Sequence, residues 1–255
     1  YEMQRSLVGS EMCIRDSTVA TEMYSAGIDR LTHQPLSFSV SETTEGVHIH
    51  IIDAELMGKG EKEKKDLYIE GVQNNGIINH YEYIINSEGT IEIRHVLKPE
   101  GKMPLWFPRI GLTLTVSDAL DQVKWYGRGP QENYPDRKTG YPMGIYASTV
   151  QAMYEPYLMP QDYGLRTDVR WLQLTTDKGI GLQFKMNEWF NFNIYPYSTD
   201  NLTKAMYTYQ LQKQKGMTLN LDYATTGVGC TARGVFGAYK AMPQDCLLYT
   251  SDAAD

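Results

Sequence analysis

Three features are scarce in this sequence of 255 residues: cysteine, excess positive charge and long apolar runs. No run approaches the ~20 apolar residues that a membrane-spanning helix requires. Acidic residues outnumber basic ones by 31 to 24, which gives a net charge of −7. This balance argues against binding to nucleic acid or to an anionic membrane, because both need a basic face. We therefore expect a soluble protein with no nucleic-acid or membrane partner.

The two ends of the chain differ in character from the rest. Residues 1–17, YEMQRSLVGSEMCIRDS, resemble a translated sequencing-library adaptor, and residues 246–255, CLLYTSDAAD, resemble the opposite adaptor. Neither end has the apolar periodicity that would anchor it to a domain. The alternative for the first segment is a degenerate signal peptide, but its charged residues leave no apolar core of the needed length. We expect both ends to be non-native and residues 18–245 to form one domain.

Without the two ends, Cys230 is the one cysteine that remains. A single cysteine excludes a disulfide framework and a multi-cysteine metal site, and it does not indicate the redox compartment. The same segment has 22 basic and 26 acidic residues, for a net charge of −4. Its length allows a sizeable hydrophobic core.

Alternation of apolar and polar residues dominates the middle of the chain. Residues 36–40 and 47–52 alternate as strands with one buried face do. Asn86-Ser87-Glu88-Gly89 separates residues 81–85 from residues 90–97, which predicts an antiparallel hairpin. Further strands are expected at residues 109–116, 123–126, 166–175, 179–185, 190–195, 206–212 and 217–223, and one short helical turn at residues 198–204, with Ser198 or Thr199 as its N-cap.

This pattern predicts an all-β protein. Strands follow one another at short spacing, and 22 glycines and 11 prolines separate them. No segment alternates strand with long helix, as a parallel sheet would. We therefore predict a large antiparallel β-sandwich.

Residues 125–137 read WYGRGPQENYPDR and are too particular for an ordinary turn. Gly127, Gly129, Pro130 and Pro135 fix an irregular backbone path among charges of both signs. The string resembles the C-terminal region (small chain, domain 5) of the glycoside hydrolase family 2 β-galactosidases. Blocks at residues 143–174, 190–205 and 219–229 follow in that family's order and spacing, so that the resemblance covers residues 24–243.

The resemblance implies a galactose-mutarotase-like supersandwich and a parent enzyme that hydrolyses terminal non-reducing β-D-galactosyl residues with retention. It also implies that the catalytic glutamates lie on a (β/α)8 barrel upstream, with the ligands of Mg²⁺ and Na⁺. We therefore expect no catalytic residue, no cofactor and no metal ligand in this chain, and no activity from it alone. Its expected partners are that barrel, a β-galactoside substrate and further copies of the full enzyme. The parent would be cytoplasmic or periplasmic.

Four charged residues of the long motif are candidates for a structural role: Arg128, Glu132, Asp136 and Arg137. The two arginines are close enough in sequence to pair with one or both carboxylates. A carboxylate paired with arginine stays ionised and is a poor general acid at neutral pH. We therefore favour a salt-bridged structural corner, with a sugar or interdomain contact as the alternative.

His48 and His50 form a His-x-His pair that places both imidazoles on one face of a strand. Metal ligands occur in such pairs, but no third ligand at a recognisable spacing accompanies them. We favour two polar residues on the exposed face of a strand.

The segment after Val228 is the candidate substrate border. In the family that the sequence resembles, the loop after the glycines that match Gly227 and Gly229 reaches toward the barrel, and a Trp or Cys there borders the sugar site. Here the sequence is GCTARGVFGAYK, without tryptophan, and Cys230, Thr231 or Arg233 would occupy that position. A missing aromatic ring weakens stacking on a sugar. A plain connecting loop is the alternative.

Two other functions are compatible with such a sandwich. A mutarotase-like aldose epimerase needs a general acid and a general base about the sugar ring, commonly His with Glu, and no His here has a recognisable motif context. A non-catalytic carbohydrate-binding module would bind sugar by itself. We favour the C-terminal domain of a β-galactosidase over both.

Overall fold

The computed structural model describes residues 3–6, 31–57, 75–101, 106–228 and 246–252. Within these residues twelve strands form one antiparallel sheet, and the expected all-β class is confirmed. The main path of the sheet runs in the order β1-β6-β11-β10-β12-β5-β4-β3-β2, with β7, β8 and β9 joined through β10. The strands are β1 (Met3–Ser6), β2 (Leu31–Thr43), β3 (Gly46–Met57), β4 (Gly76–Ile85), β5 (Ile91–Glu100), β6 (Arg109–Val116), β7 (Gln122–Arg128), β8 (Met143–Thr149), β9 (Arg166–Thr175), β10 (Gly181–Tyr195), β11 (Met217–Thr225) and β12 (Cys246–Asp252).

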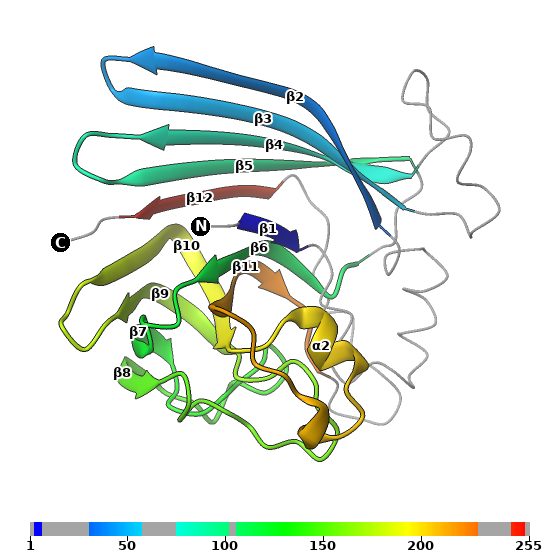
Figure 1. The fold of residues 1–255 in the computed structure, drawn as a ribbon, viewed down its shortest axis with the longest axis vertical. Coiled ribbons are helices and arrows are strands. Elements are labelled where there is room, and N and C mark those ends of the chain that lie inside the picture. Colours follow the sequence, from blue (N-terminus) through cyan, green and yellow to red (C-terminus); the bar gives the residue numbers. More distant parts are fainter. Residues whose placement is uncertain (1–2, 7–30, 58–74, 102–105, 229–245, 253–255) are drawn as a thin grey trace.

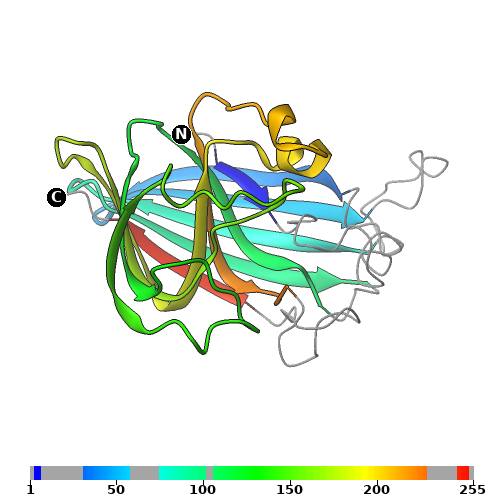
Figure 2. The same ribbon diagram turned by 90° about the horizontal axis from the view of Figure 1, so that it is seen from below.

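The sheet folds over on itself into two layers. Strands β2 to β5 are long and form the upper layer in Figure 1, whereas β7, β8 and β9 lie below. Figure 2 shows the green and yellow strands of the lower part in front of the long blue and cyan strands. The expected antiparallel sandwich is thus observed.

Strand β10 has 15 residues and links several parts of the sheet. It pairs with β9 at residues 181–185, 190 and 192, with β12 at residues 184–186 and with β11 at residues 191–195. The register of the β9 pairing shifts between Lys185 and Phe190. The sequence predicts two strands here, and the structure shows a single strand with an irregularity between them.

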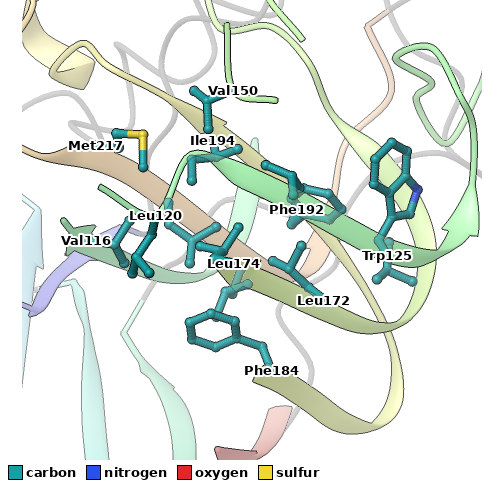
Figure 3. Close-up of a cluster of buried hydrophobic side chains, with 14 of the residues drawn as sticks. Val116, Leu120, Trp125, Val150, Leu172, Leu174, Phe184, Phe192, Ile194 and Met217 are labelled. Atoms are coloured by element: carbon teal, nitrogen blue, oxygen red, sulfur yellow. The ribbon is translucent and has the colours of Figure 1, made fainter. Parts of the chain in front are cut away.

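The main core lies between the β6-β11-β10 part of the sheet and the strands β7 and β9 (Figure 3). Trp125 meets Phe192 edge to face at 5.8 Å between ring centroids, an arrangement worth about 0.5–1.5 kcal/mol beyond the area buried. Leu172 is completely buried beside them. The buried members are Val116, Leu120, Val123, Trp125, Val150, Met153, Val169, Leu172, Leu174, Phe184, Phe190, Phe192, Ile194, Met217, Leu219 and Leu221.

The predicted hairpin at residues 86–89 is confirmed. Asn86 accepts hydrogen bonds at its Oδ1 from the backbone N–H groups of Glu88, at 3.0 Å, and Thr90, at 2.9 Å. Gly89 adopts a φ of 85°, a left-handed conformation that glycine takes without steric cost. The turn chemistry of this sequence therefore sets the register between β4 and β5.

The short helix is also where the sequence predicts it. Helix α2 spans Thr199–Lys204, and its N-cap is Ser198, whose side chain accepts a hydrogen bond from the backbone N–H of Asn201. Asp200 occupies the first turn and Lys204 the last, as the helix dipole favours. In the part of the chain that the structure describes, no helix is both long enough and apolar enough to cross a membrane.

The prediction of a strand at residues 206–212 is wrong, because this segment contains a 3₁₀ turn, Thr208–Gln210. The side chain of Gln210 accepts from the backbone N–H groups of Met206, at 2.7 Å, and Tyr207, at 3.2 Å. These two backbone N–H groups therefore donate to a nearby side chain and are not available for hydrogen bonds to a neighbouring strand. The sequence analysis does not predict strand β8, since four of its seven residues are small or polar.

Strand β2 departs from the expectation of one buried face. Phe38 and Val40 are 68% and 54% exposed. Both lie on β2, which ends the path of the sheet and pairs with β3 alone among the strands of the described residues. Alternation in the sequence therefore identifies the strand correctly, but it does not ensure that a second layer covers the apolar side.

Strands β1 and β12 fall in the two segments that resemble adaptors. β1 pairs with β6, and β12 pairs with β5 and β10. Backbone ladders form with almost any side chain, so this pairing is compatible with a native or a non-native origin. The boundaries of the domain at residues 18 and 245 stay a prediction.

The core assignment predicts unequal effects for two identical substitutions. Leu172→Ala removes a completely buried side chain and should lower the free energy of unfolding by about 2–5 kcal/mol, because it leaves a cavity. Leu158→Ala changes a side chain that is 94% exposed and should alter that free energy by less than about 0.5 kcal/mol. Urea denaturation of the two variants measures both values. Equal losses would contradict this location of the core.

Candidate functional site

The motif at residues 125–137 forms a compact corner at the end of β7. Trp125 is buried and donates from its Nε1 to the backbone oxygen of Arg128 at 3.1 Å. The guanidinium of Arg166 lies 5.4 Å from the centre of the Trp125 ring, and burial lowers the pKa of Arg166 to about 10. The aromatic residue that opens the motif therefore fixes the turn that follows it.

Glu132 is the buried centre of this corner, with 6% of its surface exposed. Its carboxylate accepts hydrogen bonds from Arg137 Nη2 at 2.7 Å, from the backbone N–H of Gly164 at 2.9 Å and from the hydroxyl of Tyr157. Burial and the hydrogen bond to Glu132 raise the pKa of Tyr157 above its ordinary value, so the phenol stays protonated and donates. Glu132 therefore joins three segments of the chain.

Arg128 uses a partner outside the motif. Its Nε lies 2.5 Å from Asp168 Oδ2, and Lys138 Nζ lies 2.7 Å from Asp168 Oδ1. Burial alone would raise the pKa of Asp168, but the hydrogen bonds from Lys138 and Arg128 lower it below its ordinary value. Asp168 also has a left-handed backbone, with a φ of 56°. It therefore stays ionised between two cations and is unsuited to donate a proton.

Asp136 connects the corner to the segment that was expected to border the substrate. Its Oδ1 accepts a hydrogen bond from the backbone N–H of Val228 at 3.1 Å. Gly227 approaches so closely that a Cβ there would lie 2.4 Å from Asp136 Cγ. Cys230, Thr231 and Arg233 themselves lie outside the described residues. The structure thus places the start of their segment directly against the corner.

Of the four motif charges, the structure brings Glu132 and Arg137 together, while Arg128 and Asp136 turn to other segments. Sequence reasoning missed Tyr157, Lys138 and Asp168 as partners. Residues 143–174 carry the family resemblance and hold two of them, but nothing in their spacing indicates which polar side chain faces the corner.

A second group of charges, fully buried, lies between β6, β10 and β11. Arg109 Nη2 is 2.8 Å from Asp222 Oδ2, and its Nη1 is 3.6 Å from Asp162 Oδ1. Asn193 donates to Asp162 at 2.8 Å and accepts from Asn220 at 2.8 Å. Burial, with the nearby charge of Asp162, raises the pKa of Asp222 to about 7 although Arg109 opposes the rise.

A carboxyl with a pKa near 7 is a candidate for acid–base chemistry. The side chains of Asp162 and Asp222 are each 1% exposed, however, so neither is accessible to a sugar from outside. We assign this group a structural role. Sequence reasoning missed it, because the alternation in β11 does not reveal that both faces of that strand are buried.

The His48–His50 pair has a third potential ligand that its spacing in sequence does not indicate. Glu82 lies on β4 directly opposite His50, and one ligand atom from each of the three residues lies within 4.8 Å of the others. Glu82 is remote from both histidines in sequence, so only the register of β3 against β4 identifies it.

The contact between Asp136 and Gly227 predicts that a methyl group is not tolerated at residue 227. Gly227→Ala should lower the free energy of unfolding by about 1–3 kcal/mol, because the new Cβ overlaps the carboxyl of Asp136. Gly140→Ala is the matched control, since nothing lies within 4 Å of a Cβ there. Urea denaturation of both variants measures the difference. A Gly227→Ala variant as stable as the control would contradict the contact.

The raised pKa of Asp222 predicts a pH dependence of stability. The folded protein holds this proton more tightly than the unfolded chain, so the free energy of unfolding should fall as pH rises from about 4 to about 7 and then level off. Asp222→Asn removes the titrating group and should reduce that fall. The comparison is made by urea denaturation across this range, with the exposed Asp200→Asn as control. An equal fall of the free energy of unfolding in the unsubstituted chain and in Asp222→Asn would exclude Asp222 as its source.

Comparisons with known proteins found a family match and several similar β-galactosidases. Residues 16–247 match the family described as "Beta galactosidase small chain". The chain is 38% identical over 147 residues to a β-galactosidase of Priestia megaterium, covering 58% of this chain and 14% of that protein. It is 39% identical over 122 residues to a β-galactosidase of Vibrio cholerae, covering 48% and 11%, and 28% identical over 208 residues to one of Aeromonas hydrophila, covering 80% and 18%.

A solved structure of a GalM/aldose epimerase homologue from C. elegans is also similar, with 10% identity and a TM-score of 0.43 over 86% of this chain and 69% of that one. The chain spans less than a fifth of the length of the three β-galactosidases. Because the family match covers most of its residues, the chain belongs to the β-galactosidase small-chain family.

Proposed function

We propose that this chain is the domain of a β-galactosidase that borders the sugar site without supplying its catalytic carboxylates. The parent enzyme would hydrolyse terminal non-reducing β-D-galactosyl residues with its two glutamates on an upstream (β/α)8 barrel. That barrel would also hold Mg²⁺ and Na⁺. The domain's contribution would be to orient the substrate through the segment that begins at Gly227.

The contact between Asp136 and Val228 carries this proposal. A border to a sugar site must keep its position, since a displacement of ~1 Å can cost up to ~100-fold in rate. Asp136 holds the backbone of Val228, and Asp136 belongs to a corner that is itself fixed by Glu132 and Arg137. The segment with Cys230, Thr231 and Arg233 therefore begins from a rigid base.

The environments of the buried carboxylates support a role without bond cleavage. Glycoside hydrolysis uses two carboxyl groups on either side of one glycosidic bond, and one of them must give up a proton. Glu132 accepts from Arg137, and Asp168 accepts from Arg128 and Lys138. The hydrogen bonds from Lys138 and Arg128 lower the pKa of Asp168, so it stays ionised, and the general acid is better sought in another part of the parent enzyme.

The proposal predicts that the chain alone does not hydrolyse a chromogenic β-D-galactoside. Joined in frame to the coding region upstream of it in its genome, it should form an enzyme that does. In that enzyme Gly227→Ala should raise KM by about 10-fold with a smaller change in kcat, because it displaces a border and not a reacting group. Steady-state hydrolysis measures both constants.

Gly140→Ala is the control for that enzyme, because residue 140 has open space around it and follows the motif by three residues. Its KM should equal that of the parent. Turnover by the isolated chain, above the rate of a chain with Glu132→Gln and Asp168→Asn, would overturn the proposal.

A further inference from the structure

We propose that His48, His50 and Glu82 form a binding site for a divalent transition-metal ion of the Zn²⁺ type, on the face of the sheet opposite to the Tyr81–Tyr83 side. This site is separate from the corner at residues 125–137, and it does not depend on the proposed function. The residues come from the neighbouring strands β3 and β4, which are part of the rigid ladder of the upper layer (Figure 1).

The register of the two strands brings the ligands together. His50 is paired directly with Glu82, and His48 lies two residues earlier on β3, on the same face. Glu82 Oε1 lies 3.6 Å from His48 Nδ1 and 3.9 Å from His50 Nε2. Zn²⁺ binds nitrogen and oxygen at about 2.0–2.2 Å, so that ligand atoms around it lie about 3.3–3.5 Å apart. Small side-chain rotations would complete the geometry.

The nitrogen atoms of His48 lack hydrogen bonds that would compete with a metal. Its Nδ1 is farther from Glu82 than a hydrogen bond allows, and its Nε2 is buried and has no hydrogen-bond partner in the described part of the chain. Because Nδ1 is the atom that faces Glu82, it is the atom that would coordinate the cation, and Nε2 would then carry the proton of the neutral imidazole.

A neighbouring ion pair orients the carboxylate. Arg94 Nη1 lies 3.1 Å from Glu82 Oε2, and Arg94 Nε lies 2.6 Å from Glu92 Oε1. Glu92 offsets the charge of Arg94, and the guanidinium fixes one oxygen of Glu82 so that the other faces the two imidazoles. Partners of this kind orient metal ligands and typically account for 10–100-fold in affinity.

The burial of the three side chains leaves one side open. His48 is 13% exposed, Glu82 25% and His50 50%. Solvent therefore reaches the cluster beside His50, where Ser39 of β2 is the cross-strand neighbour. A water molecule can take the fourth position of a tetrahedral ion, as in sites with three protein ligands. Two imidazoles and one carboxylate favour Zn²⁺, Co²⁺ or Ni²⁺ over Mg²⁺ and Ca²⁺, which prefer oxygen.

The test is calorimetric titration of the whole 255-residue chain with ZnCl₂, after alkylation of its three cysteines, since thiolates also bind Zn²⁺. The variants are His48→Gln, His50→Gln and Glu82→Gln. Each should bind Zn²⁺ at least about 10-fold more weakly than the unsubstituted chain. The control is His80→Gln, which changes a histidine on the same face of β4, two residues from Glu82. Its affinity should not change.

A second readout, thermal unfolding, does not use the heat of binding. Saturating Zn²⁺ should raise the melting temperatures of the unsubstituted chain and of His80→Gln by about 5 °C. It should not change the melting temperature of His50→Gln. Because His50 is half exposed, its replacement should not prevent folding. Absence of Zn²⁺ binding by the unsubstituted chain at millimolar Zn²⁺ would overturn the proposal, and so would an equal affinity of His50→Gln and the unsubstituted chain.

Discussion

The buried carboxylate of Glu132 is the interaction on which the geometry of the corner depends. A charge so shielded from water costs several kcal/mol unless donors surround it. Its donors come from Arg137, Tyr157 and Gly164, so the chain must return to Glu132 after β8. This return closes the corner and places Asp136 where Val228 passes. The position of Gly227 and Val228 is therefore a consequence of satisfying one buried charge.

The second buried group of charges has a related consequence for the sheet. Residues 192–195 of β10 and 217–222 of β11 are buried on both faces of the sheet, with apolar side chains such as Leu219 on one face and polar ones such as Asn220 on the other. A shift of one residue in register would exchange the two faces. It would bring Asp222 into the apolar core and take it away from Arg109. The polar network thus specifies the register, although buried ion pairs add little net stability.

Local signals in the sequence predict much of this fold. Alternation finds β6 and β9 with their observed bounds, and the Asn86 turn and the Ser198 cap act through contacts within a few residues. The partners of the corner were not predictable, because Arg128 meets Asp168 only after β7 and β9 have paired. The same holds for Glu82 and His50. Which strands become neighbours is decided by packing of the whole chain, and spacing in one segment does not contain that information.

Glu132 and Glu82 are both glutamates near an arginine, and the difference between their surroundings separates a structural group from a binding site. Both oxygens of Glu132 have close donors, so its capacity as an acceptor is used within the fold. Glu82 has Arg94 at one oxygen, while the other faces two imidazoles beyond hydrogen-bond range. A proton can link only one imidazole to that oxygen at a time. A divalent cation links all three groups at once, and so the chemistry at β3 and β4 is better matched by a metal than by further hydrogen bonds.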